Sequence, residues 1–93
     1  MDVSAPLAVI ASVRQIAGSV DGIAEIEKCR IRKSGLHLAM DIHVLVNGEL
    51  AVRRGHEIAG QVKRRLLDSQ HRIADVTVHI EPAATVKSGN ATA

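Results

Sequence analysis

Two stretches of the chain alternate between apolar and polar residues with the period of a β-strand. Side chains on a strand point to opposite faces in turn, so each stretch is predicted to have one core face and one polar face. The core-face residues are Leu36, Leu38, Met40, Ile42, Val44 and Val46 in residues 36–46, and Val76, Val78 and Ile80 in residues 75–81. The polar faces carry His37, Ala39, Asp41 and His43 on the first stretch, and Thr77, His79 and Glu81 on the second. Two strands bearing histidine and carboxylate groups are the strongest functional signal in this sequence.

Two other stretches have the 3.6-residue period of a helix that is apolar on one side. The first covers residues 5–17, with Ser4 as its predicted N-cap and Gly18 as its stop. The second covers residues 50–69, and its predicted buried stripe is Val52, Ala59, Val62 and Leu66. Both helices can therefore cover one face of a sheet.

The order of the elements predicts the topology. Residues 23–32 form a further predicted strand, and Lys33, Ser34 and Gly35 form the hairpin turn that follows it. The strand at 36–46, the helix at 50–69 and the strand at 75–81 make a β-α-β unit, whose right-handed crossover leaves the two strands parallel. The fold class is thus α+β, ordered α-β-β-α-β, with a three-stranded mixed sheet and two helices on one face. By the alternation, the open face carries Glu25, Glu27, Cys29, His37, Asp41, His43, Thr77, His79 and Glu81.

The composition narrows the class of protein. The 93 residues are 46% hydrophobic but include no Phe, Tyr or Trp, so the predicted core is aliphatic and its stability is expected to lean on self-association. A net charge of +2 does not demand a polyanionic partner, and one cysteine cannot form an internal disulfide. No apolar stretch approaches the ~20 residues that a membrane helix needs. We expect a cytoplasmic chain without membrane insertion, with a domain at residues 1–83 and a disordered tail at residues 84–93.

His43, His79 and Glu81 are the candidate metal ligands. They are expected on neighbouring strands about 4.8 Å apart and on one face, within reach of a single divalent ion such as zinc. The alternative is an ordinary polar sheet face with hydrogen-bonded histidines.

Several other chemistries are disfavoured. His56 and Glu57 open a helix as they would in a zinc protease, but the second histidine, needed one turn later, is replaced by Gly60. No nucleophile has a base beside it, and the chain lacks the aromatic side chains that stack RNA bases on a sheet. We therefore expect neither an enzyme nor a nucleic-acid-binding protein.

Four segments resemble one known family. They are Gly22–Ile23 with Cys29–Arg32 and Ser34–Gly35, then Asp41–Val44, then Val52–Ile58, and last Val76–Pro82, which is similar to a "VxVHxEP" ending. Their order and spacing resemble the cytoplasmic C-terminal domain of the cation diffusion facilitators. The resemblance implies a ferredoxin-like fold and a V-shaped homodimer that binds zinc or a related divalent transition metal at or near its interface and biases a membrane transporter. It also implies ligand positions at His43, His79, Glu81 and His56, with Glu27 at a position that is often histidine.

Two function classes stay open at this point. The first is a metal-sensing regulatory and dimerisation domain, either part of a transporter or free-standing and paired with one. The second is a metal-independent ferredoxin-like interaction or small-ligand-binding domain. For the remaining residues the plainer interpretations are favoured: a surface histidine at His37, a solvated helix-end imidazole at His71, a surface or second-layer carboxylate at Asp41 and a small buried hydrophobe at Cys29.

Overall fold

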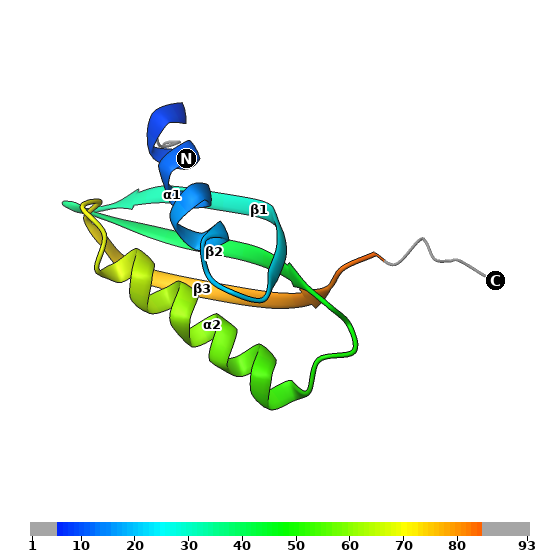
Figure 1. The fold of residues 1–93 in the computed structure, drawn as a ribbon. Helices are drawn as coiled ribbons and strands as arrows, with labels where there is room; N and C mark the ends of the chain where they lie inside the picture. Colours follow the sequence, from blue (N-terminus) through cyan, green and yellow to red (C-terminus); the bar gives the residue numbers. More distant parts are fainter. Residues whose placement is uncertain (1–5, 85–93) are drawn as a thin grey trace.

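The computed structural model describes residues 6–84 and contains two helices packed on one face of a three-stranded sheet (Figure 1). The elements are α1 (Leu7–Gly18), β1 (Ile23–Ser34), β2 (His37–Val46), α2 (Val52–Leu67) and β3 (Ile73–Pro82). The sheet order is β1-β2-β3, with β1 antiparallel and β3 parallel to β2. The predicted α-β-β-α-β order and mixed sheet are confirmed.

Some sequence predictions fall outside the described residues. Ser4, the predicted N-cap of the first helix, is one of them, and so are residues 85–93 of the predicted tail. Pro6 precedes the first helical residue and provides no side-chain cap. Within residues 6–84, neither helix combines the length and apolar character needed to cross a bilayer.

The core is aliphatic and lies between the helices and the sheet. Its fully buried side chains are Val13, Met40, Ile42, Val44, Ile58, Val62 and Leu66. Full burial of each such side chain stabilises the fold by roughly 1.5–3 kcal/mol relative to exposure. Both strands predicted from their alternation therefore turn the expected face toward the helices.

Two residues predicted to lie in the core are exposed. Val52 is 90% exposed because it is the first residue of α2, and the buried stripe of that helix runs instead through Gly55, Ile58, Val62 and Leu66. Leu36 is 83% exposed because the hairpin turn falls at Gly35 and Leu36, one residue later than predicted. Gly35 has a φ of +64°, a conformation that glycine adopts without strain.

Strand β1 does not alternate regularly along its length. Its pairing with β2 shifts register twice, between Ile23 and Glu25 and between Ile26 and Lys28. The second shift is a β-bulge, in which an extra residue interrupts the ladder. Residues after it face the opposite way from the simple alternation, so Cys29 packs against the core and not on the open face. The predicted placement of Cys29 on the open face is wrong for this reason.

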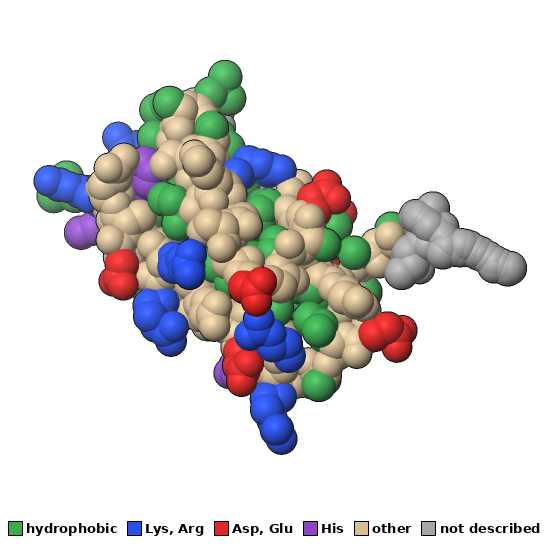
Figure 2. All heavy atoms as spheres, in the orientation of Figure 1, with side chains coloured by type: hydrophobic (Ala, Val, Ile, Leu, Met, Phe, Trp, Pro, Cys, Tyr) green, Lys and Arg blue, Asp and Glu red, His purple; other side chains and the backbone are tan. Residues whose placement is uncertain are grey.

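Charged side chains of both signs are mixed on the helix-bearing side of the molecule (Figure 2). Arg54 on α2 pairs with Glu57 one turn along the helix, at 3.3 Å, and with the Asp21 carboxylate at 3.5 Å. Exposed pairs of this kind contribute little stability. The basic residues of α2 thus belong to a solvated helix face.

Candidate metal centre

The site is built on the open face of the sheet, where β2 and β3 run in parallel. His43 on β2 lies directly opposite His79 on β3 in the pairing register. The two imidazole rings are stacked, with centroids 4.4 Å apart and planes inclined by 16°. Two residues further along β3, Glu81 extends over His43, and its Oε2 accepts a hydrogen bond from His43 Nδ1 at 2.7 Å.

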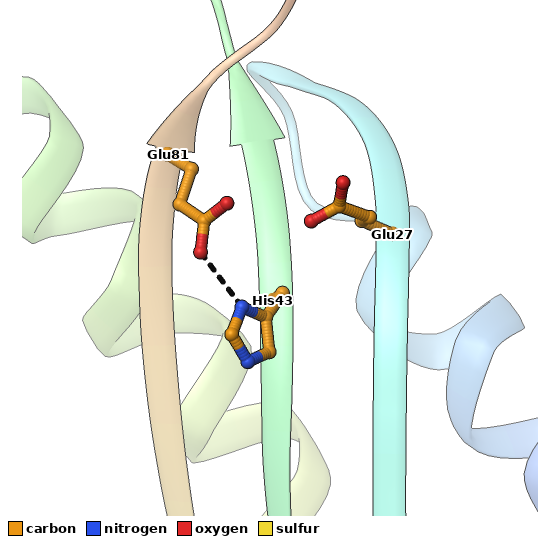
Figure 3. Close-up of side chains that lie close together, drawn as sticks. All are labelled: Glu27, His43 and Glu81. Carbon is orange, nitrogen blue, oxygen red and sulfur yellow. Dashed lines mark hydrogen bonds and ion pairs between the residues drawn. The ribbon is translucent and has the colours of Figure 1, made fainter.

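The third strand brings a second carboxylate to the same place. Glu27 reaches His43 from β1, so that the imidazole lies between two acidic side chains (Figure 3). One ligand atom from each of Glu27, His43 and Glu81 lies within 4.8 Å of the others. Each strand of the sheet therefore contributes one potential ligand to a common point.

The hydrogen bond between His43 and Glu81 determines which imidazole nitrogen of His43 carries the proton. A carboxylate oxygen can only accept, so His43 Nδ1 carries the proton of this hydrogen bond, and that nitrogen can bind an ion shared with Glu81 only when the proton is released or moves to Nε2. The hydrogen bond from His43 is the main reason that the pKa of Glu81 lies below its ordinary value of 4.5, with smaller contributions from the nearby Glu27 and His79 side chains. Glu81 is therefore ionised and ready to bind a cation near neutral pH.

The donor set fits a divalent transition metal. Imidazole nitrogen and carboxylate oxygen are both ordinary ligands for zinc at about 2.0–2.2 Å. Two donors on one ion are at most ~4.2 Å apart at those distances, so the three side chains need to close by only a fraction of their present 4.8 Å. Two facing carboxylates repel each other when both are ionised, and a cation between them relieves that repulsion.

Two predicted ligands lie outside this three-residue cluster. His79 is held in the stack beside His43, and its ring must turn to bring a nitrogen onto a shared ion. His56 is exposed on the first turns of α2. It lines a groove of about 500 Å³ between α2 and β3 that Glu81 also borders, and it is not part of the three-residue cluster.

The remaining candidates are dispersed. His37 is exposed at the start of β2, and Asp41 pairs in register with Arg30 and Thr77 further along the sheet. His71 is not the solvated imidazole that the sequence predicted, because it is half-buried and its Nε2 lies 2.9 Å from Ser12 Oγ on α1. Burial raises the pKa of the Cys29 thiol, and the nearby positive charge of Arg14 opposes that shift.

Comparison with known proteins identifies the family of the chain. A family described as "Cation efflux protein, cytoplasmic domain" matches residues 5–83. The chain belongs to this family. The recognition of a cation diffusion facilitator C-terminal domain from sequence motifs is thereby confirmed.

Relatives of this cation efflux domain include plant proteins named for metal tolerance and bacterial proteins named for manganese efflux. Metal tolerance protein C1 of Arabidopsis thaliana is 28% identical over 83 residues, which are 89% of this chain but 18% of the relative. Manganese efflux system protein MneS of Bacillus subtilis is 27% identical over 73 residues, which are 78% of this chain and 25% of the relative. The chain thus spans about a quarter or less of the length of these curated relatives.

Solved structures support the ferredoxin-like fold. The MamM CTD is 26% identical and superposes with a TM-score of 0.79 over 83% of this chain and 98% of that one. A MamM CTD variant described as a nickel form is 24% identical, with a TM-score of 0.80 over 85% of this chain and all of the other. In both cases nearly the whole of a separately solved domain corresponds to this chain.

Proposed function

We propose that this chain is a divalent-metal-binding regulatory and dimerisation domain of a cation efflux protein, acting in the cytoplasm and not itself moving ions. The observation that carries the proposal is the convergence of Glu27, His43 and Glu81 from three strands. Membership of the cation efflux family supplies the context in which such a site has a purpose.

Each predicted ligand has a stated role in the proposal. His43, Glu81 and Glu27 bind zinc or another divalent transition metal, and His79 turns out of its stack with His43 to add a fourth donor. His56, which lines the groove beside Glu81, completes the ligand set in one subunit or across a dimer. Because the ligand set mixes imidazole with carboxylates, zinc, manganese, ferrous iron, cobalt and nickel are all chemically suitable. The names of the relatives include manganese efflux, and a related domain has a nickel form.

The proposed assembly is a homodimer that reports metal to a membrane transporter. An aliphatic core and an open polar sheet face suit a chain that gains stability by pairing, and most homodimers contact through the same patch on each subunit. The functional unit is residues 1–83, so a chain ending at Ala83 should bind metal as tightly as the full chain. Sedimentation at tens of micromolar should show a dimer, with or without metal, and a monomer in both conditions would contradict this part of the proposal.

Calorimetric titration with zinc, manganese and nickel tests the metal site directly. His43→Ala, His79→Ala and Glu81→Gln should each lower the affinity of the tightest-binding metal by at least tenfold. His37→Ala is the matched control, because His37 lies on the same strand and face but away from the cluster. If His43→Ala and His79→Ala both bind as tightly as the unmodified chain, the site is elsewhere.

A second candidate function rests on the groove between α2 and β3. Its walls are largely apolar and include Val46, Leu50, Val52, Val78, Ile80 and Pro82. A groove of this kind suits a metal-independent interaction or small-ligand-binding domain. That function is favoured if no metal binds in the titration and if Val78→Asp, inside the groove, disrupts the dimer.

A further inference from the structure

Glu27, one of the candidate ligands, is the extra residue at the bulge in β1. Ile26 lies opposite Val44 and Lys28 lies opposite His43, so Glu27 is the extra residue in the strand. Glu27 and Lys28 are both exposed, whereas Ile26 before them and Cys29 after them pack on the core side. The bulge therefore presents two consecutive residues to the open face, and one of them is a ligand candidate.

Arg14 contacts the backbone of this bulge from the helix-covered side of the sheet. It lies on α1, and its Nη2 donates a hydrogen bond of 2.6 Å to the carbonyl oxygen of Ile26, the residue before Glu27. Its positive charge also acts on the thiol of Cys29, two residues after Glu27. The guanidinium thus contacts β1 at the residue before Glu27, and its charge is felt at the residue two positions after Glu27. A hydrogen bond from a charged donor is roughly twice as strong as a neutral one, and a bulge leaves backbone groups that need such partners.

We infer that Arg14 is a positioning residue for the metal centre: it holds the β1 bulge in the shape that keeps the Glu27 carboxylate within reach of His43 and Glu81. This inference rests on the proposed metal-binding function. Arg14 itself touches no candidate ligand and lies on the opposite face of the sheet, so its effect must pass through the backbone of Ile26 and Glu27.

The attachment of α1 to β1 should be coupled to metal binding. If the contact between Arg14 and Ile26 favours metal binding, metal binding must favour that contact by the same factor, because coupling between two sites is reciprocal. The metal centre on the open face is then linked to the position of a helix on the covered face. Occupancy of the site strengthens the attachment of α1 to β1.

The test compares the metal affinity of Arg14 variants of the full chain by calorimetry, using the tightest-binding metal from the titration above. Arg14→Ala should weaken binding by about tenfold, the usual effect of losing a group that orients a metal ligand. Arg14→Lys, which keeps the charge and one donor, should recover most of that loss. Arg54→Ala is the matched control, because Arg54 ties α2 to the turn at Asp21 and does not contact the bulge; its affinity should stay within twofold. Should Arg14→Ala not fold, Arg14→Gln gives the same comparison.

A double-mutant cycle separates positioning from general loosening of the fold. In a Glu27→Gln background, removal of Arg14 should cause no further loss of affinity, because the two changes act through one carboxylate. Hydrogen exchange gives a second readout: metal should slow exchange in α1 of the unmodified chain but not of Arg14→Ala. An unchanged affinity in Arg14→Ala, or a full additional loss in the Glu27→Gln background, would overturn the inference while the effect of His43→Ala still decides the metal site.

Discussion

The two faces of the sheet are made by the same strands but have opposite physical demands. On the covered face, Ile42 and Val44 are fully buried under the helices, and size and shape decide whether they are tolerated. On the open face, the alternate residue His43 is partly exposed and hydrogen-bonded to Glu81, and the hydrogen-bonding and metal-binding capacity of its side chain decides which residues can replace it. We therefore expect residues that control stability and residues of the proposed metal site to be separable, one position apart along β2.

Substitution of neighbouring residues should reveal the largest difference between the faces. Ile42→Ala leaves a cavity in a fully packed core and should lower the free energy of unfolding by about 3 kcal/mol, whereas His43→Ala should lower it by less than about 1 kcal/mol. Urea denaturation in the absence of metal measures both. Since a small domain can be unfolded by the first change, Ile42→Val, with an expected loss of about 1 kcal/mol, serves as the milder variant. Equal losses at positions 42 and 43 would show that the open face is also part of the stabilising core.

In the presence of metal, the open-face substitution His43→Ala should lower the melting temperature more than the mild core substitution Ile42→Val. A ligand that binds only the folded state at 100 times its dissociation constant stabilises that state by about 2.7 kcal/mol. The melting temperature of the unmodified chain and of Ile42→Val should therefore rise with metal, and that of His43→Ala should not. The rise should shrink as the pH is lowered, because an imidazole must lose its proton to bind a metal. A rise that persists undiminished in His43→Ala would place the metal elsewhere.

The covered face was predictable from sequence and the open face only in part. Alternation in β2 and β3 was sufficient to identify Ile42 as core and His43, His79 and Glu81 as neighbours on the other face. Both strands are regular over those residues, and their parallel pairing follows from the β-α-β connection. The burial predictions failed at the ends of elements, at Leu36 and Val52, because burial there depends on where a turn or helix begins.

Strand β1 shows why the remaining features of the candidate site could not be predicted from the sequence. The bulge at Glu27 changes which residues share a face, and no residue in this stretch has a side chain that requires a bulge. Alternation placed Glu27 on the open face correctly, but it placed Cys29 there as well, and the bulge is the reason that Cys29 packs on the core side. Arg14 had no sequence signal at all, because its partner is a backbone carbonyl twelve residues away.

The carboxylate of Glu81 offers a smaller test of the open face without metal. Its pKa is lowered chiefly by the hydrogen bond from His43, so in His43→Ala the pKa should move up toward the ordinary 4.5. Because the folded pKa is below the unfolded one, this pair contributes stability above about pH 4.5, and the contribution is lost as the pH falls through the folded pKa. Carbon NMR titration of the Glu81 carboxyl group measures the shift. An identical titration curve in His43→Ala and the unmodified chain would mean that the hydrogen bond does not persist in solution.

The smallest expected effect concerns Cys29, which follows the bulge in β1 and packs on the core side of that strand. The thiolate is the reactive form of cysteine, and burial raises the pKa of this thiol above its ordinary 9.0. Alkylation by iodoacetamide at pH 8 should therefore be slower in the folded chain than in urea, and the contribution of Cys29 to stability should be complete below pH 9 and decline above it. Cys29→Ala should cost little stability, because the side chain is only half-buried at the edge of the core. If the bulge were absent, Glu27 would pair with His43 and Cys29 would lie on the open face opposite Asp41, near the proposed metal site. The thiol would then react readily, and bound metal would protect it. Rapid alkylation that metal suppresses would therefore show that β1 alternates regularly in solution, and slow alkylation that metal does not alter would support the bulge.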